Sequence, residues 1–489
     1  MKTRWYCIAA MASRIAFSQV AEAADLHVAT IGTDCPPFNS QRSSSSVMVE
    51  CSRLSFPVVD TGQDKCYGAH SAIPFPRSGE EFFGQDAQYE GLVPLYRDNS
   101  DGTVADVNTG LMWQKTPPDT RFTQNEAEKY AENLQLAGYD DWRLPNIKEL
   151  FSIADLRGDM HSHIPYIDTR FFDFTYPVAT GNRPGMRGMD AQYASSTRYV
   201  GITMGKDKSA FGFNFADGRI KSYPLTGKRF VRCVRGNPDY GKNRLRDNGD
   251  GTVTDVATGL VWQKSDSGTP MNWKDALRYT EHLRLADRGD WRLPNVKELQ
   301  SIVDYTRAPD AFDPARRGPA IDPIFDVTQT ESWYWTSTTH VETGFAYYVS
   351  FGQAFSARTM NGKKINAHGA GAVRSDPKEG ENRWPYGLGP QGDEIRIMNY
   401  VRCVCGGDAK LATTPASPYA VETQPAMSTR GTRDNAHFIH RLDTNGDGKV
   451  SRDEFNRSSR RFDILDTNGD GFISETEALT DLPRRVNKR

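Results

Sequence analysis

Short stretches of alternating hydrophobic and polar residues recur along the chain, separated by a few segments with helical spacing. Residues 252–262, TVTDVATGLVW, predict a strand, a turn and a second strand. A helix is predicted to begin near Asn272, because three apolar residues then share one face: Ala276, Tyr279 and Leu283. Alternation returns in YYVSF (347–351), which indicates another strand. The predicted fold class is α+β, with two helices in each unit against small antiparallel sheets.

The whole pattern occurs twice. Residues 97–151 align without gaps with residues 246–300. Each copy contains DWRLPN followed by KEL, then YASST or YWTST, and ends in a VRCV strand. Self-similarity of this kind indicates two copies of one structural unit. In the first copy the helical face is formed by Ala127, Tyr130 and Leu134.

Capping signals mark the start of both helices in each copy. A Thr or Asn is followed three residues later by an acidic residue, as in a capping box. The pairs are Thr123 with Glu126, Asn272 with Asp275, Asn146 with Glu149, and Asn295 with Glu298. The second helix is expected to turn inward Ile147, Leu150 and Ile153 in the first copy, and Val296, Leu299 and Ile302 in the second.

The domain organisation follows from these patterns. An irregular, cysteine-containing segment precedes the repeats and is expected to pack on the first copy, and an Ala/Thr/Ser/Pro-rich linker follows them. The predicted parts are a signal peptide (1–23), the irregular segment (24–94), copy one (95–237), copy two (245–407), the linker (408–433) and a small C-terminal domain (434–489).

The N-terminus has the features of a secretory signal. Lys2 and Arg4 precede a short apolar stretch, and Ala21-Glu22-Ala23 fits a cleavage site. The alternative is a cytoplasmic amphipathic start. Export predicts a secreted, periplasmic or cell-surface protein, and an even number of cysteines then indicates disulfides, whose pairing stays open. The six that remain are Cys35, Cys51, Cys66, Cys233, Cys403 and Cys405.

Composition excludes some classes of partner. The 489 residues are 37% hydrophobic and 25% charged, with a formal net charge of −2. This balance is typical of globular domains and gives no bulk bias toward nucleic acid or a membrane surface, so no nucleic-acid partner is predicted. No run of 18 apolar residues occurs, so no transmembrane segment is predicted.

Two C-terminal loops, DTNGDGKVSRDE (443–454) and DTNGDGFISETE (466–477), satisfy the EF-hand pattern. Their spacing wraps hard oxygen ligands around one Ca²⁺, and Val450 and Ile473 are placed to pair as a short strand between the loops. The predicted domain is a small all-α EF-hand pair. The ligands would be Asp443, Asn445, Asp447, Lys449, Ser451 and Glu454, then Asp466, Asn468, Asp470, Phe472, Ser474 and Glu477, with the backbone carbonyl serving at Lys449 and Phe472.

A third Asp-rich stretch, RDNGDGTVTD (246–255), only partly fits that pattern. With Gly251 at loop position 6, position 1 is Arg246 and position 12 is Ala257. A cation stands where an anion is needed, and the closing carboxylate is missing. The stretch is therefore interpreted as a hairpin turn between strands.

The ordered motifs NGDGTVTD, TGLVWQ, DWRLPNVKEL, YWTST and YVRCV resemble the Lcl C-terminal domain family. The resemblance spans about 97–236 and 246–406. It implies a fold similar to C-type lectin-like domains, so the fold expected is two tandem domains of that type followed by the EF-hand pair. The adhesin after which the family is named binds sulfated glycosaminoglycans, so the resemblance implies the same kind of ligand here. This chain has no Gly-X-Y collagen stretch.

Basic residues near the end of the first copy suit such a polyanion. The candidate ligand-binding residues are Arg219, Lys221, Lys228 and Arg229, with Trp333, Trp335 and Trp384 as candidates for stacking on sugar rings. The competing interpretation is a solvated strand face and core tryptophans. The partner predicted is a sulfated glycan or a surface protein, and the oligomeric state stays open.

Two alternatives to an adhesin-like binding role remain. The RLPN–KEL segment also resembles, more distantly, formylglycine-generating enzymes, which use a cysteine pair. Cys403 and Cys405 are the one close pair here, and Arg402 could activate a thiolate, although structural disulfides are favoured. The other alternative is an architectural envelope protein. The sequence favours a binding role over an enzyme and assigns no catalytic residues.

Overall fold

The computed structural model describes residues 54–177, 191–340, 344–360, 362–380, 392–407, 409–412, 449–452, 454 and 470–474. The predicted signal peptide, Cys35, Cys51 and Trp384 lie outside these residues. Among the described residues, no helix combines the length and apolar character needed to cross a bilayer.

Each repeat contains a four-stranded antiparallel sheet. In the first repeat the order is β10-β6-β5-β4, formed by β4 (Tyr96–Asp98), β5 (Thr103–Asp106), β6 (Leu111–Gln114) and β10 (Val234–Gly236). In the second it is β11-β12-β13-β19, formed by β11 (Leu245–Asp247), β12 (Thr252–Asp255), β13 (Leu260–Gln263) and β19 (Val404–Gly406). The predicted strand, turn and strand are confirmed, and the fold is α+β with sheet predominating.

Two helices accompany each sheet, as predicted. They are α1 (Gln124–Glu132) and α2 (Ile147–Ser152) in the first repeat, and α3 (Trp273–His282) and α4 (Val296–Ser301) in the second. Thr123, Asn146 and Asn295 form capping boxes with the predicted glutamates, and the Asn272 side chain accepts from the Asp275 backbone N–H. The local capping rules therefore place all four helix starts correctly.

The WRLPN–KEL motif forms a buried electrostatic unit at the start of the second helix. Arg292 donates from both terminal nitrogens to Glu298, at 2.6 Å each, and Arg143 binds Glu149 in the same way. Each glutamate also accepts from the backbone N–H of the N-cap asparagine. One carboxylate thus holds both the arginine and the first turn of the helix.

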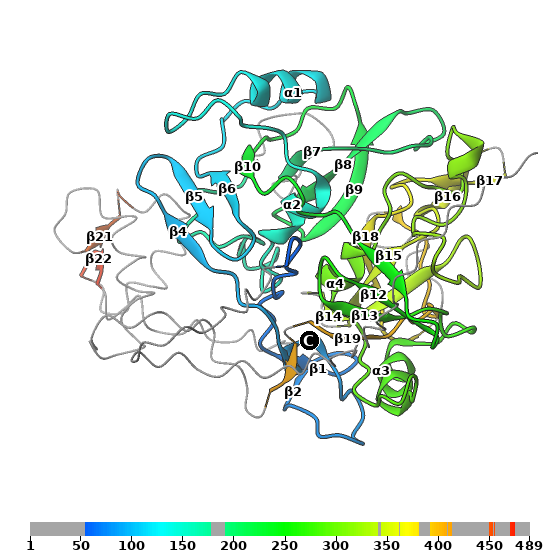
Figure 1. Cartoon of the computed structure of the whole chain (residues 1–489). Helices are drawn as coiled ribbons and strands as arrows, with labels where there is room; N and C mark the ends of the chain where they lie inside the picture. Colours follow the sequence, from blue (N-terminus) through cyan, green and yellow to red (C-terminus); the bar gives the residue numbers. More distant parts are fainter. Residues whose placement is uncertain are drawn as a thin grey trace, which may run out of the picture. The chain divides into compact units, whose positions relative to one another are not determined.

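A six-stranded antiparallel sheet joins the repeats, in the order β14-β15-β18-β9-β8-β7 (Figure 1). The strands are β7 (Gln192–Arg198), β8 (Ser209–Asn214), β9 (Arg219–Pro224), β14 (Trp333–Thr339), β15 (Phe345–Ser350) and β18 (Val373–Pro377). The order is palindromic, because β9 and β18 are matching strands of the two repeats and pair at the centre, with Ile220 opposite Val373. The repeats are therefore related by an approximate two-fold axis.

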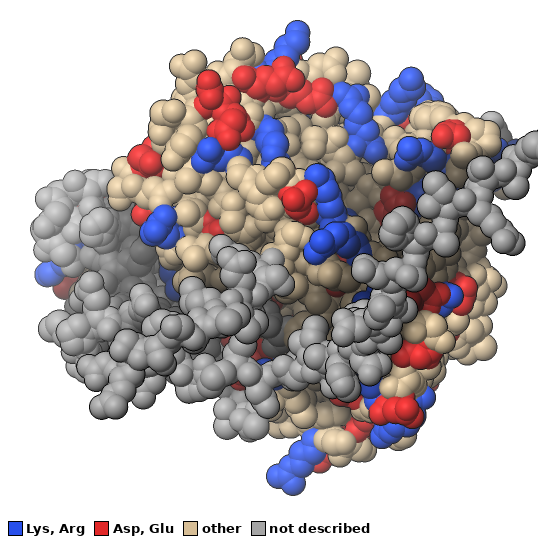
Figure 2. Space-filling view, in the orientation of Figure 1, with Lys and Arg blue, Asp and Glu red and all other residues tan. Residues whose placement is uncertain are grey.

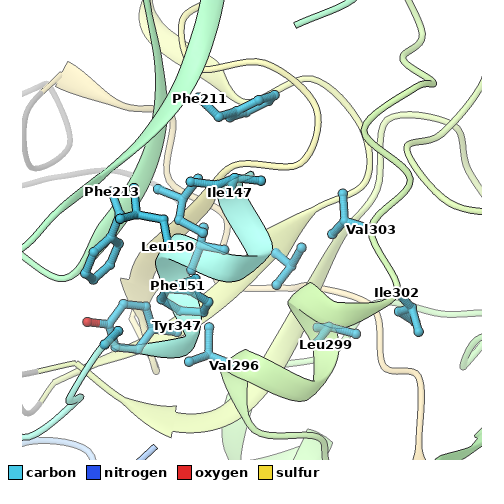
Figure 3. Close-up of a cluster of buried hydrophobic side chains, with 14 of the residues drawn as sticks. Ile147, Leu150, Phe151, Phe211, Phe213, Val296, Leu299, Ile302, Val303 and Tyr347 are labelled. Carbon is cyan, nitrogen blue, oxygen red and sulfur yellow. The ribbon is translucent and has the colours of Figure 1, made fainter. Parts of the chain in front are cut away.

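The second helices of the two repeats share one hydrophobic core. Ile147, Leu150 and Phe151 of α2 belong to the same buried cluster as Val296 and Leu299 of α4, and Figure 3 shows the two helices side by side within this cluster. A shared core of close-packed side chains couples the two repeats energetically. We therefore expect them to unfold as one unit.

Two lysines of the KEL segments reinforce this contact. Lys148 Nζ donates to the Ser301 carbonyl of the other repeat at 2.7 Å, and Lys297 Nζ donates to the Ser152 carbonyl at 3.1 Å. Each ammonium thus binds the last residue of the opposite helix. Burial lowers the pKa of both lysines to about 8.

The insertion in the second repeat also contacts the first. It forms a hairpin of β16 (Phe355–Met360) and β17 (Lys363–Asn366). The Asn366 carbonyl accepts from Met204 N at 2.8 Å, and its side-chain amide donates to the Tyr199 hydroxyl at 3.0 Å. Part of this Gly-rich insertion is therefore a structural latch between the repeats.

The segment before the repeats contacts both copies. It packs on the first copy as expected, where Leu156 N donates to the Thr61 carbonyl at 2.8 Å, and residues 76–84 also cover α3 of the second. Lys274 Nζ lies 3.0 Å from a Glu81 carboxylate oxygen, and the Phe82 ring lies 6.2 Å from that of Trp273. The reason is that α3 carries Trp273 on this face, whereas α1 has the polar Gln124 at the matching position. The segment contains β1 (Cys66–Tyr67), β2 (Ala72–Ile73), the 3-10 turn η1 (Asp86–Gln88) and β3 (Tyr89–Glu90).

The chain after the second repeat returns to this segment. Strand β20 (Lys410–Leu411) pairs antiparallel with β3, so the first residues of the predicted linker 408–433 belong to the folded unit. The rest of that linker lies outside the described residues.

The two Arg–Glu pairs offer a matched test of the motif. Arg292→Met leaves the Glu298 carboxylate buried without its partner, since these two side chains are only 5% and 6% exposed. We expect it to lower the free energy of unfolding by about 3–5 kcal/mol. Arg143→Met should cost less, because the Arg143 side chain is 37% exposed and water replaces it. Urea unfolding of both variants measures the difference, and equal losses would contradict this assignment.

A second test concerns Asp86, whose carboxylate accepts from the Thr61 and Thr338 hydroxyls. Burial raises the pKa of Asp86 to about 7, and the neighbouring Asp60 charge adds to the effect. The folded state then holds a proton between about pH 4 and 7 that an unfolded carboxyl has lost, so stability should fall as pH rises through that window, by at most about 1.4 kcal/mol per pH unit.

Asp86→Asn should remove this dependence. Urea unfolding at several pH values between 4 and 7.5 gives the difference between the original protein and the variant. A difference that stays constant across the window would show that Asp86 titrates normally.

Candidate functional site

Three of the four residues predicted to form a basic patch on the first repeat are buried rather than exposed. Arg219, Lys221 and Arg229 are 2%, 7% and 2% exposed. Arg219 donates to the Ser375 hydroxyl at 2.8 Å, and Arg229 donates to the Gln124 side-chain oxygen at 2.6 Å. Arg219 and Lys221 lie on β9, which is an interior strand of the joined sheet rather than a solvated one.

Arg219 and Lys221 belong to an ionic cluster between the repeats. Lys221 Nζ lies 3.2 Å from Asp217 Oδ2, and on the other repeat Arg374 and His368 both contact Asp393. Burial opposes the ionisation of Asp217, yet Lys221 and Arg219 hold its pKa at about 2. The cluster brings opposite charges together inside the protein, next to the β9–β18 contact.

The aromatic candidates for sugar stacking are also buried. Trp333 and Trp335 are 1% and 0% exposed and belong to the core of the second repeat. Trp333 stacks on Tyr348, with ring centroids 4.6 Å apart. The competing interpretation, that tryptophan belongs to the core, is the correct one for both.

Lys228 alone among the predicted ligand-binding residues is exposed, and it lines a groove beside α1. We call this the Arg121 groove. Its volume is about 530 Å³, and it is lined by Thr120, Arg121, Phe122, Glu126, Lys129, Tyr130, Asn133, Leu134, Gln135 and Lys228. Three cations therefore meet one acidic residue along a groove with an aromatic wall.

The aromatic wall is continuous with a second hollow of about 430 Å³, which also contains Arg121. The Arg121 guanidinium lies 4.5 Å from the centre of the Phe230 ring, and the Phe122 and Tyr130 rings are 5.1 Å apart. Tyr176 lines the far side of this hollow. The arrangement offers flat apolar rings next to positive charge.

The described residues on the face shown in Figure 2 form no extended area of positive charge that would single out this groove. Figure 2 shows basic and acidic side chains interspersed over the visible face. Arg121 and Lys129 were not predicted as binding residues, because neither lies in a run of basic residues. A comparison of the two copies could have found them, since the second copy has Pro270 and Met398 where the first has Arg121 and Lys228.

The matching surface of the second repeat has a different character. Arg278, which corresponds to Lys129, forms an ion pair with Asp275 at 3.1 Å, and Met398 is 45% exposed. In contrast, among the described residues neither Arg121 nor Lys129 has an ion-pair partner. The three positions that carry the cations of the Arg121 groove thus hold no unpaired cation in the second repeat.

The described part of the EF-hand region agrees with the predicted loops. Strand β21 (Val450–Ser451) pairs antiparallel with β22 (Phe472–Ile473), and Val450 lies opposite Ile473 as predicted. Of the twelve predicted ligands the described residues are Lys449, Ser451, Glu454, Asp470, Phe472 and Ser474. The other six lie outside the described residues: Asp443, Asn445, Asp447, Asp466, Asn468 and Glu477.

Local geometry in these loops fits a hard cation. Gly471, at loop position 6, has φ +85°, the conformation that the sharp turn needs and that glycine adopts without strain. Asp470 Oδ1 accepts from Phe472 N at 2.9 Å, and Glu454 Oε2 accepts from Ser451 N at 2.9 Å. The donor set is carboxylate, amide, hydroxyl and carbonyl oxygen, which suits Ca²⁺. A bound ion would tie both loops to the β21–β22 pair.

The stretch 246–255 is a hairpin turn between β11 and β12, which confirms that interpretation. Its acidic side chains serve the turn: Asp250 Oδ1 accepts from Thr252 N at 3.1 Å, and Asp247 pairs with Lys264 at 2.6 Å. Within the described residues, no group of three or more His, Cys, Asp and Glu side chains is placed to hold a metal ion.

The expected disulfides are not formed among the described cysteines. Cys66, Cys233, Cys403 and Cys405 are free and buried. Cys233 and Cys403 occupy matching core positions of the two repeats, where each acts as a small apolar side chain.

The thiols also lack the environment that the enzyme alternative requires. Burial raises the pKa of Cys405 to about 12 and that of Cys403 well above its usual value. Arg402, expected to activate a thiolate, donates to the backbone carbonyls of Gln263 and Asp326, at 2.8 Å each. A neutral, enclosed thiol is a poor nucleophile.

Calcium binding can be tested at the closing glutamates of the two loops. Glu454→Gln and Glu477→Gln each remove a ligand carboxylate, so we expect the calcium affinity of the altered loop to fall at least tenfold, which is about 1.4 kcal/mol. Isothermal titration of the full chain measures the affinity. Asp250→Asn, in the β11–β12 hairpin, is the matched control and should leave the titration unchanged. Normal binding by both glutamate variants would contradict the assignment.

Comparison with known families agrees with this layout. The Lcl C-terminal domain model matches residues 102–235 and 251–374, and an EF-hand model matches residues 436–457 and 460–477. The EF-hand match implies calcium as the usual ligand. No curated protein matches the chain. Because the two Lcl matches together cover more than half of its length, the chain belongs to the Lcl C-terminal domain family.

Proposed function

We propose that this is an exported, calcium-binding protein whose first repeat binds sulfated glycans at the cell surface, in the manner of an adhesin. The observation that carries the proposal is the Arg121 groove, in which cations and aromatic rings line one open surface. The family resemblance and its C-type lectin-like expectation support the same role. The binding surface differs from the one that the run of basic residues suggested.

The chemistry of the groove suits sulfated sugars. Arg121 and Lys129 come from the start and middle of the α1 region, and Lys228 comes from the turn before β10. Sulfate groups are strong anions, and unpaired cations on a shared surface attract them. The apolar face of a sugar ring packs on aromatic side chains, which Phe122 and Tyr130 provide here.

The one carboxylate in the groove is already engaged. Glu126 Oε2 accepts from the Thr123 backbone N–H at 2.8 Å and from its hydroxyl at 2.9 Å. Because Glu126 serves as the helix cap, its charge is held at the end of the groove and Lys228 further lowers its pKa. The remaining cations stay available to a ligand.

Calcium has a separate role in this proposal. The EF-hand loops follow the repeats in sequence and share none of the residues of the Arg121 groove. Calcium sites of extracellular modules are weak and remain filled at the calcium concentration outside cells. The ion would therefore stabilise the C-terminal domain without contacting the glycan.

The triple variant Arg121→Ala, Lys129→Ala, Lys228→Ala tests the groove. We expect at least a tenfold loss of affinity for a heparin fragment, because each lost cation removes attraction to a sulfate. Binding by the original protein should also weaken as salt rises from 0.05 to 0.5 M, by screening. Surface plasmon resonance of the full chain, with calcium and again with chelator, measures both effects.

Arg278→Ala, the equivalent change on the second repeat, is the matched control. It should leave heparin binding unchanged, since Arg278 is already paired with Asp275. Binding that survives the triple variant would place the glycan elsewhere, and the absence of saturable binding would overturn the proposed function.

A further inference from the structure

The approximate two-fold axis creates two related grooves between the repeats, and the described part of the chain fills only one. In the filled groove, residues 58–63 run as an extended segment. The Asp60 carbonyl accepts from Lys297 Nζ at 2.8 Å, and the Thr61 carbonyl accepts from Leu156 N at 2.8 Å. Val59 forms a parallel bridge with Leu92. A peptide segment thus binds where the two repeats meet.

The related groove on the other side is open and has a volume of about 590 Å³. Its lining residues match those of the filled groove by position in the repeat: Lys148 corresponds to Lys297, Thr197 to Thr338, and Tyr305 to Leu156. We call it the open groove. The linker between the repeats supplies Gly241 and Asn243 to its edge, where they bind Lys148 Nζ.

Two hydrogen-bond donors that are used in the filled groove are unused in the open one. Leu156 N donates to the Thr61 carbonyl, whereas Tyr305 N has no acceptor among the described residues. The Thr338 hydroxyl donates to Asp86, whereas the hydroxyl of Thr197 accepts from Ile147 N and has no acceptor of its own in the described part of the chain. Both donors line the open groove, where they could bind the backbone of another extended segment.

The two grooves differ in the charges of the residues that line them. In the filled groove, Asp155 pairs with Arg157 at 2.5 Å and Asp168 with Arg170 at 2.6 Å. In the open groove the carboxylates are kept as Asp304 and Asp322, but Thr306 and Ile324 replace the arginines. Neither carboxylate forms an ion pair within the described residues.

The one cation that lines the open groove forms no direct bond to either carboxylate. Lys148 Nζ donates to Gly241, Asn243 and Ser301, which uses all three ammonium hydrogens. An occupant that carries Lys or Arg side chains would supply the two missing positive charges.

We propose that the open groove binds an extended, basic peptide segment of a partner protein. The segment follows the path that residues 58–63 take in the filled groove, with backbone carbonyls toward Tyr305 N and cationic side chains toward Asp304 and Asp322. The site involves none of the residues of the Arg121 groove, so the proposal does not depend on glycan binding.

Two synthetic peptides labelled with fluorescein serve as probes. One has the sequence of residues 56–65, FPVVDTGQDK, and the other is FPVVRTGQRK, in which arginine replaces both aspartates. Fluorescence anisotropy with the full chain is expected to show saturable binding of the basic peptide, at least tenfold tighter than that of its acidic parent and weakened by salt. No saturable binding of the basic peptide would overturn the proposal.

The double variant Thr306→Arg, Ile324→Arg restores in the open groove the arginines that the first repeat carries at the matching positions. It should form the Asp–Arg pairs of the filled groove, keep its unfolding temperature, and lose at least tenfold in affinity for the basic peptide. Thr306→Arg alone changes one exposed side chain and should cause a smaller loss. Glu132→Arg, outside the groove on α1, makes the same change in net charge as the double variant and should leave binding intact. Equal losses in the control, or undiminished binding by both groove variants, would overturn the proposal.

Discussion

The antiparallel contact between β9 and β18 is the constraint on which the rest of the structure depends. It merges the strands of two repeats into one sheet and brings α2 and α4 into a common core. The same contact puts Arg219 and Lys221 in the interior, where Asp217 must accompany them, because a buried charge without a partner is costly. Both grooves between the repeats exist only because this contact holds the repeats face to face.

Much of the fold could be predicted from the sequence because its rules are local. Asn146 and Asn295 cap their helices through residues three positions away, and the β11–β12 turn is determined by its own glycines and aspartates. Val450 and Ile473 could be paired from loop positions alone. In each case the interaction that decides the structure joins residues close in sequence or placed by a fixed motif.

The candidate site could not be predicted in the same way, because burial is a property of the whole chain. Arginine side chains are usually exposed, and only the structure shows that Arg229 is buried against Gln124, 105 residues away in the sequence. The cysteines were expected to pair because export favours disulfides, yet a thiol such as Cys403 also fills a core position well. The two copies differ most where they meet other segments, so their differences carry more information about function than their shared motifs.

The filled groove has a consequence for the order in which the chain folds. Lys297 binds the Asp60 carbonyl across 237 residues, and Asp86 binds Thr338 across 252. Residues 58–63 and Asp86 are synthesised long before these partners and can meet them only after much of the second repeat has been made. Contacts at such sequence separation slow folding, since a long loop must close before they form. Closure of the filled groove is therefore expected only after Thr338 has been synthesised, and a chain that ends before this point would leave residues 58–63 without a complete binding groove.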